Sequence, residues 1–79
     1  MTLEGLTYVN VEIVEAKNLP IADLNGKADP FCVVHVDGID GEQRTSVKEK
    51  TLDPKWGESF SFDLSTVKNP NLQVEVFDQ

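Results

Sequence analysis

Apolar and polar side chains alternate along most of this 79-residue chain, and a period of two is typical of half-buried β-strands. Val9, Val11 and Ile13 form the first such series, because Asn10 and Glu12 separate them. The same alternation recurs further along and predicts an all-β fold. The expected strands cover residues 7–15, 31–37 and 43–50, a fourth segment marked by Phe60, Phe62 and Leu64, and a fifth segment over 72–76.

Turn-forming residues separate these segments. Residues 37–41 contain two Gly and two Asp, which tolerate positive φ and therefore predict a hairpin turn. Pro-containing turns are expected at 52–57 and 69–71. Five strands joined in this way predict an antiparallel β-sandwich or barrel. Because the fifth strand ends close to the last residue, at least one sheet edge is expected to stay open.

Composition narrows the classes of function. Seven Lys and Arg stand against fourteen Asp and Glu, a net charge of −7, so a nucleic-acid binder that must neutralise phosphates is not expected. No apolar run is long enough to span a bilayer. Cys32 is the single cysteine and cannot form an internal disulfide, and residues 1–20 lack the pattern of a signal peptide. We therefore expect a reducing, intracellular setting.

The positive charge is concentrated in the middle of the chain. Residues 43–55 carry four basic and two acidic side chains, and the expected strand would place Arg44, Lys48 and Lys50 in a row on one face. Such a row can bind the headgroups of anionic lipids, although those clusters usually hold about four to eight bases. A solvated strand face is the other interpretation, and the sequence favours it.

Acidic side chains are concentrated in the connection between the first two strands. Asp23, Asn25, Gly26 and Asp29 lie there, and Asp78 follows the fifth strand. Carboxylates that meet at one end of a sandwich can bind Ca²⁺, which takes six to eight oxygen ligands. Three Asp supply at most six oxygens, so backbone carbonyls, water or a ligand would have to help. The alternative, that each Asp only bonds its own turn, stays open.

The order of four motifs resembles the C2 domain, from about Leu6 to the last residue. The motifs are Val9-x-Val11-x-Ile13-x-Glu15-Ala16-Lys17-Asn18-Leu19-Pro20, Asp23-x-Asn25-Gly26-Lys27-Ala28-Asp29-Pro30-Phe31, Thr51-Leu52-Asp53-Pro54-Lys55-Trp56-Gly57-Glu58-x-Phe60-x-Phe62 and Leu72-x-Val74-x-Val76-Phe77-Asp78. The resemblance implies an eight-stranded antiparallel Greek-key β-sandwich, of which about five strands are present here. Residues 1–79 would then form a single C2-like domain that is incomplete at its C-terminus.

The resemblance also implies the ligands of a Ca²⁺ site. Asp23 and Asp29 match the two ligands of the first loop, and Asp78 matches the first ligand of the third loop; Ala22 is assigned to the same expected metal site. This sequence departs from the family after Asp78, where members carry further acidic ligands and three more strands, whereas only Gln79 follows here.

The function that the resemblance implies is Ca²⁺-dependent binding to anionic membranes containing phosphatidylserine or phosphoinositide, which would recruit an attached protein from the cytoplasm to a membrane surface. Without cation the clustered carboxylates repel anionic lipid, and Ca²⁺ reverses that field. Leu24, with Ile21 and Ala22, is expected to enter the headgroup region, or else to pack under its loop. The alternative function is a Ca²⁺-independent protein-interaction or dimerisation module, such as a strand-exchanged homodimer.

An enzyme is the least favoured class. Cys32 and His35 are three residues apart on an expected strand, so their side chains point to opposite faces and form no nucleophile–base pair. Trp56, Phe60 and Phe62 are expected to pack in the core rather than to bind a ligand. The sequence therefore predicts a binding module, with any catalysis in another domain of a longer protein.

Overall fold

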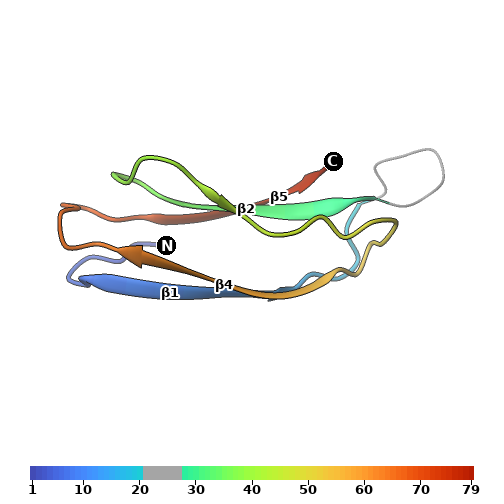
Figure 1. Ribbon diagram of the computed structural model, residues 1–79, viewed down its shortest axis with the longest axis horizontal. Coiled ribbons are helices and arrows are strands. Elements are labelled where there is room, and N and C mark those ends of the chain that lie inside the picture. The colour runs from blue at the N-terminus through green and yellow to red at the C-terminus, as the bar shows by residue number, and fades with distance from the viewer. Residues whose placement is uncertain (21–27) are drawn as a thin grey trace.

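The computed structural model describes residues 1–20 and 28–79, and in this part of the chain the regular structure is entirely β. Two antiparallel sheets lie one above the other (Figure 1), with the strand orders β1-β4 and β3-β2-β5. The all-β sandwich that the alternation predicts is confirmed. The described residues contain no helix of the length and apolarity needed to cross a membrane. The strands are β1 (Tyr8–Glu15), β2 (Pro30–Val36), β3 (Gln43–Arg44), β4 (Lys55–Asp63) and β5 (Leu72–Asp78).

The first sheet buries the apolar series that the sequence shows. Val9 lies opposite Phe62, and Val11 lies opposite Phe60, across the β1–β4 pair. Residues directly opposite one another in an antiparallel pair share a face, and all four pack in or against the core. The period of two therefore reflects burial of one sheet face, with Asn10 on the face toward solvent.

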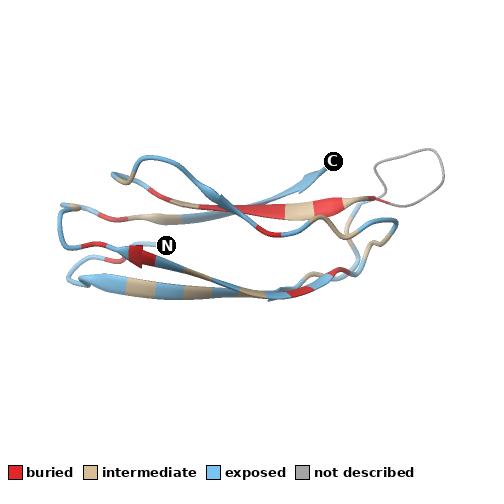
Figure 2. Ribbon diagram, in the orientation of Figure 1, coloured by how far each residue is buried: buried red, intermediate tan, exposed pale blue. Residues whose placement is uncertain are grey.

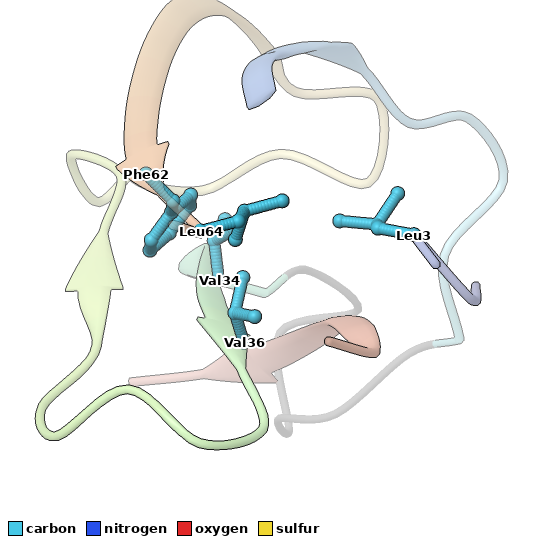
Figure 3. Close-up of a cluster of buried hydrophobic side chains, with 5 residues drawn as sticks. All are labelled: Leu3, Val34, Val36, Phe62 and Leu64. Carbon is cyan, nitrogen blue, oxygen red and sulfur yellow. The ribbon is translucent and has the colours of Figure 1, made fainter. Parts of the chain in front are cut away.

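Strand β2 is the centre of the second sheet and the most buried strand. It pairs with β3 on one side and with β5 on the other, and most of its residues are buried (Figure 2). Val34 and Val36 lie on its inner face, where they form the core with three residues from elsewhere in the chain (Figure 3): Leu3, Phe62 and Leu64. Val33, on the outer face, is also buried, which explains why this strand is apolar at both parities.

The strand expected over 43–50 is wrong beyond Arg44, because only Gln43–Arg44 pairs with β2. The hydroxyl of Thr45 replaces a backbone acceptor of the ladder: the Cys32 N–H donates to Thr45 Oγ1 at 2.8 Å. The next amide, that of Ser46, donates to the Glu58 carboxylate of β4 at 3.0 Å. Polar side chains thus take up the main-chain groups on which a longer β3 would depend.

The early end of β3 also removes the expected basic row. Arg44 remains on the strand, whereas Lys48 is half-buried beyond it. Lys50 lies in a turn with a φ of 55°. The three basic side chains therefore do not follow one strand face.

One side of the sandwich is open in the described part of the chain. Strand β5 pairs with a strand only on its β2 side, and β1 only on its β4 side. On the other side of β5, Met1 exchanges main-chain hydrogen bonds with Leu72, and the described residues place no strand beside the rest of that edge. Val74 and Val76 pair with the inward-facing Val34 and Cys32 yet remain 44% and 47% exposed. The apolar inner face of β5 thus extends beyond the cover that the β1–β4 sheet provides.

Replacing Gly38 by Ala is expected to lower the free energy of unfolding by about 1–3 kcal/mol. Gly38 has a φ of 94°, and a Cβ built there would lie 2.8 Å from Val67 Cγ1. The matched control is Gly41→Ala in the same hairpin, where φ is 87° but no atom lies within 4 Å of the added Cβ. Urea denaturation of the two variants should separate the cost of the clash with Val67 from the cost of a positive φ, which both variants share. Equal losses of stability in the two variants would show that the clash contributes nothing.

Candidate functional site

Two of the three expected acidic ligands come together at one end of the sandwich. Asp29 immediately precedes β2, and Asp78 is the last residue of β5. The antiparallel register places Pro30 opposite Asp78, and the Asp29 N–H donates to Asp78 Oδ1 at 2.7 Å. Residues 49 positions apart are thus held side by side by main-chain geometry. This end of the molecule, where β2 begins and β5 ends, is called the loop end below.

The remaining expected residues of this site fall elsewhere. Asp23 and Ala22, assigned to the metal, and Leu24, assigned to lipid, lie outside the described residues, as does Ile21. Within 1–20 and 28–79, no group of three or more His, Cys, Asp or Glu is arranged to hold a metal ion. The geometry of the candidate site therefore consists of the two carboxylates of Asp29 and Asp78.

Asp29 is fixed by contacts that the sequence did not predict. Its Oδ1 accepts a hydrogen bond from the Lys50 backbone N–H at 2.8 Å, and its carbonyl oxygen accepts from the Gln79 N–H at 3.0 Å. Hydrogen bonds to ionised carboxylates are among the stronger ones in proteins. Among the described residues, neither carboxylate uses its second oxygen in a hydrogen bond, and such an oxygen is a hard anionic ligand suited to Ca²⁺. Residue types do not reveal which main-chain amide will meet a carboxylate, so the sequence suggested a lipid contact for Lys50 but not this contact with Asp29.

Two other acidic side chains accept main-chain hydrogen bonds where the chain turns. Asp53 Oδ1 accepts from the Asn18 N–H at 2.8 Å, where Asn18 has a φ of 55°. Asp63 Oδ1 accepts from the Ser65 N–H at 2.9 Å, and this hydrogen bond lowers the pKa of the exposed Asp63 carboxyl. The Asp63 contact is local to its turn, whereas the Asp53 contact joins residues 35 positions apart. The contact between Asp29 and Asp78 joins two strand ends.

Apolar surface adjoins the two carboxylates. A hollow of about 220 Å³ is lined by Leu19, Pro20, Val76 and Phe77 together with Asp78. Phe77 is exposed, and its ring stacks on that of Phe31 with 5.7 Å between centroids. The loop end thus presents hydrophobic and anionic groups side by side.

The outer face of the β3-β2-β5 sheet is not a basic surface. The Arg44 guanidinium lies 3.7 Å from a Glu42 carboxylate oxygen and 5.6 Å from the centroid of the Phe31 ring. The adjacent hollow, of about 390 Å³, has two acids and one His in its described lining. It is formed by Val33, His35, Gly41, Glu42, Gln73 and Glu75. Arg44 is therefore already paired with an acid on a face that carries more negative than positive side chains.

The Cys and His of β2 are placed as their spacing predicted. Cys32 is buried and lies opposite Val76 on the inner face, and this burial raises the pKa of its thiol. His35 lies on the other face, with Nε2 3.4 Å from Asp37 Oδ1. A buried thiol of raised pKa is a poor nucleophile, and the His35 ring cannot reach it through the sheet.

Comparison with known proteins decides the family. A family model described as the C2 domain matches residues 7–79. The chain belongs to the C2 domain family. The resemblance inferred from the four motifs is therefore confirmed, and this C2 domain is a member of a family of binding modules.

Curated relatives and a solved structure support the assignment. The C2 domain is 44% identical over 73 residues to a C2 and GRAM domain-containing protein of Arabidopsis thaliana, covering 90% of this chain and 7% of that protein. It is 33% identical to Synaptotagmin-4 of the same organism, covering 99% of this chain and 14% of that protein. A structure of Extended-Synaptotagmin 2 that comprises its SMP domain and two C2 domains matches with a TM-score of 0.79 and 28% identity, over 95% of this chain and 18% of that one.

The C2 domain thus spans only a small part of the length of these relatives. The family and its synaptotagmin members support membrane and lipid binding in general terms. The geometry of the loop end bears on how this particular C2 domain carries out such binding.

Proposed function

We propose that this C2 domain binds anionic phospholipid membranes in a Ca²⁺-dependent manner and recruits an attached protein from the cytoplasm to the membrane surface. The observation that supports the proposal is the hydrogen bond from the Asp29 N–H to Asp78 Oδ1 at 2.7 Å. It joins the Asp29 main chain to the Asp78 carboxylate at the loop end, beside exposed apolar surface. A net charge of −7 argues against nucleic acid as the partner.

The carboxylates of Asp29 and Asp78 hold the cation in this proposal, and Asp23 and Ala22 join them from outside the described residues. Without cation, the loop end repels anionic lipid, because its aspartate carboxylates carry charge of the same sign as the lipid headgroups. Bound Ca²⁺ supplies positive charge and open coordination positions that lipid phosphates or carboxylates can fill. Because three aspartates provide at most six oxygens, water or lipid oxygens complete the coordination.

Apolar side chains at the same end give the bound state a second source of affinity. Phe77, 43% exposed, and the apolar lining of the adjoining hollow can enter the interfacial region once the charge is cancelled, since burial of apolar area drives such insertion. Leu24 is proposed to contribute in the same way. Calcium then acts as an electrostatic switch on a surface whose hydrophobic part is always present.

The basic residues are assigned a secondary role at the membrane. Arg44, Lys48 and Lys50 remain proposed contacts for anionic headgroups, each worth about 1 kcal/mol when it lies at the membrane surface. Because Arg44 pairs with Glu42 and Lys50 lies in a turn away from β3, they would act singly rather than as a patch. No catalytic role is assigned to this domain, because Cys32 and His35 lie on opposite faces of β2.

Cosedimentation with phosphatidylserine-containing liposomes tests this function. At constant ionic strength the chain is expected to pellet with added Ca²⁺ and to stay in the supernatant with chelator. Liposomes of phosphatidylcholine alone are the matched control and should leave it in the supernatant in both cases. A folded chain that ignores Ca²⁺ on anionic liposomes would contradict the proposal.

The open side of the sandwich favours a second candidate, a Ca²⁺-independent interaction or dimerisation module. The free edges of β1 and β5 and the exposed Val74 and Val76 could pair with strands of a second copy, because unpaired edges are templates for strand addition. Sedimentation equilibrium distinguishes the two candidates: this one expects a dimer whose association is unchanged by chelator, and a monomer at all concentrations would exclude self-association.

A further inference from the structure

The turn that contains Lys50 lies directly against the candidate cation site. Lys50 and Asn18 are the two non-glycine residues with positive φ in the described part of the chain, both at 55°. A lysine gains nothing from this left-handed conformation, which most side chains avoid. The conformation instead directs the Lys50 backbone N–H to Asp29 Oδ1, at 2.8 Å.

Two flanking hydrogen bonds hold this turn in place. The Lys48 N–H donates to the Pro30 carbonyl at 3.0 Å, and the Thr51 N–H donates to the Ala28 carbonyl at 2.9 Å. The segment 48–51 is therefore anchored to the chain on both sides of Asp29. With these hydrogen bonds on either side of it, the Lys50 amide is held toward the Asp29 carboxylate.

Two consecutive hydrogen bonds connect Lys50, Asp29 and Asp78. The Lys50 N–H donates to the Asp29 carboxylate, and the Asp29 N–H donates to the Asp78 carboxylate. Each acid accepts a hydrogen bond from a neighbouring main-chain donor through its Oδ1, and no described residue bonds its second oxygen. Groups that orient metal ligands in this way commonly change metal affinity by 10–100-fold when they are altered.

We propose that the left-handed turn at Lys50 is a positioning device for the cation site, acting through its backbone amide and not through its ammonium group. The inference rests on the proposed Ca²⁺-binding function and deepens it, because it assigns to Lys50 a role different from lipid contact. For Ca²⁺ affinity in the absence of lipid, the Lys50 side chain is dispensable, whereas its backbone conformation is not.

Two substitutions that remove the same charge separate backbone from side chain. Lys50→Gly keeps the N–H and favours positive φ, so Ca²⁺ affinity measured by isothermal titration calorimetry should stay within about twofold of the parent chain. Lys50→Val keeps the N–H but, as a β-branched residue, resists positive φ, and Ca²⁺ affinity should fall by about tenfold. If Lys50→Val unfolds by circular dichroism, Lys50→Ala replaces it, with the same direction and a smaller loss.

Equal affinities in the two variants, whether both unchanged or both weakened, would overturn the positioning role. Amide hydrogen exchange provides a readout that needs no cation: exchange at residue 50 should accelerate in Asp29→Ala, and an unchanged rate would also overturn the inference. If the parent chain binds no Ca²⁺ while its residue-50 amide is protected by Asp29, the proposed function fails but the hydrogen bond stands. If Ca²⁺ binds and the variants do not differ, the positioning role alone fails.

Discussion

Replacing Asp29 by Asn is expected to weaken Ca²⁺ binding by about tenfold or more, because the charge of the ligands sets the affinity of such sites. The amide oxygen of Asn can still accept the hydrogen bond that the Lys50 N–H now gives to Oδ1, so the fold is expected to persist. Titration calorimetry measures the affinity, and thermal unfolding without Ca²⁺ shows that the variant remains folded. Liposome binding should be lost at Ca²⁺ concentrations that saturate the parent chain.

Asp40→Asn is the matched control for Asp29→Asn. Asp40 is exposed in the hairpin between β2 and β3, at the opposite end of β2 from Asp29, and its substitution changes the net charge by the same amount. We expect its Ca²⁺ affinity to match that of the parent chain. If the two variants lost affinity equally, only overall charge would matter, and the Asp29–Asp78 pair would not be the site.

Replacing Leu64 by Ala is expected to lower the free energy of unfolding by about 2–5 kcal/mol. Leu64 is 1% exposed and belongs to the core cluster that joins the two sheets in Figure 3. A 79-residue domain has a total stability on the order of 5–15 kcal/mol, so one such cavity removes a large share of it. Urea denaturation should show a lower midpoint, and the melting temperature should fall by roughly 10 °C or more.

Leu6→Ala removes the same atoms from a different environment. Leu6 is 50% exposed, so the expected loss stays below about 0.5 kcal/mol. The comparison isolates burial, because the same side-chain atoms are deleted in both variants. If Leu6→Ala were as costly as Leu64→Ala, the core would not be centred where the structure places it.

Much of the fold could be predicted because burial leaves a local trace. The residue types alone predicted the inward-facing series Val9, Val11 and Ile13 and the burial of β2 on both faces. They could do so because successive side chains of a strand point to opposite faces, so polarity at each position indicates which face is buried. Trp56 and Phe62 are buried, as expected for packing residues. The four motifs identified the C2 domain for the same reason: each combines a strand pattern with a turn.

The errors occur where side-chain hydrogen bonds and ion pairs decide the structure. Residues 45–50 alternate well enough to predict a strand, but the Thr45 hydroxyl and the Glu58 carboxylate bind the main chain instead. Arg44 was predicted as part of a basic row, yet it pairs with Glu42. The alternation of apolar and polar residues could not predict these contacts. It indicates which face of a strand is buried, but not which polar groups bind one another.

The sequence by itself determined the class of this protein: an acidic β-sandwich of the C2 family, with aspartates on the connections between strands. Only the tertiary structure decided that Asp29 and Asp78 meet through a 2.7 Å hydrogen bond and that the Lys50 amide binds the first of them. The physical reason is that burial of a sheet face selects an apolar or polar residue type at each strand position, so it can be seen in the sequence position by position. Hydrogen bonds between distant strand ends depend on register and turn geometry, which exist only once the two sheets have packed.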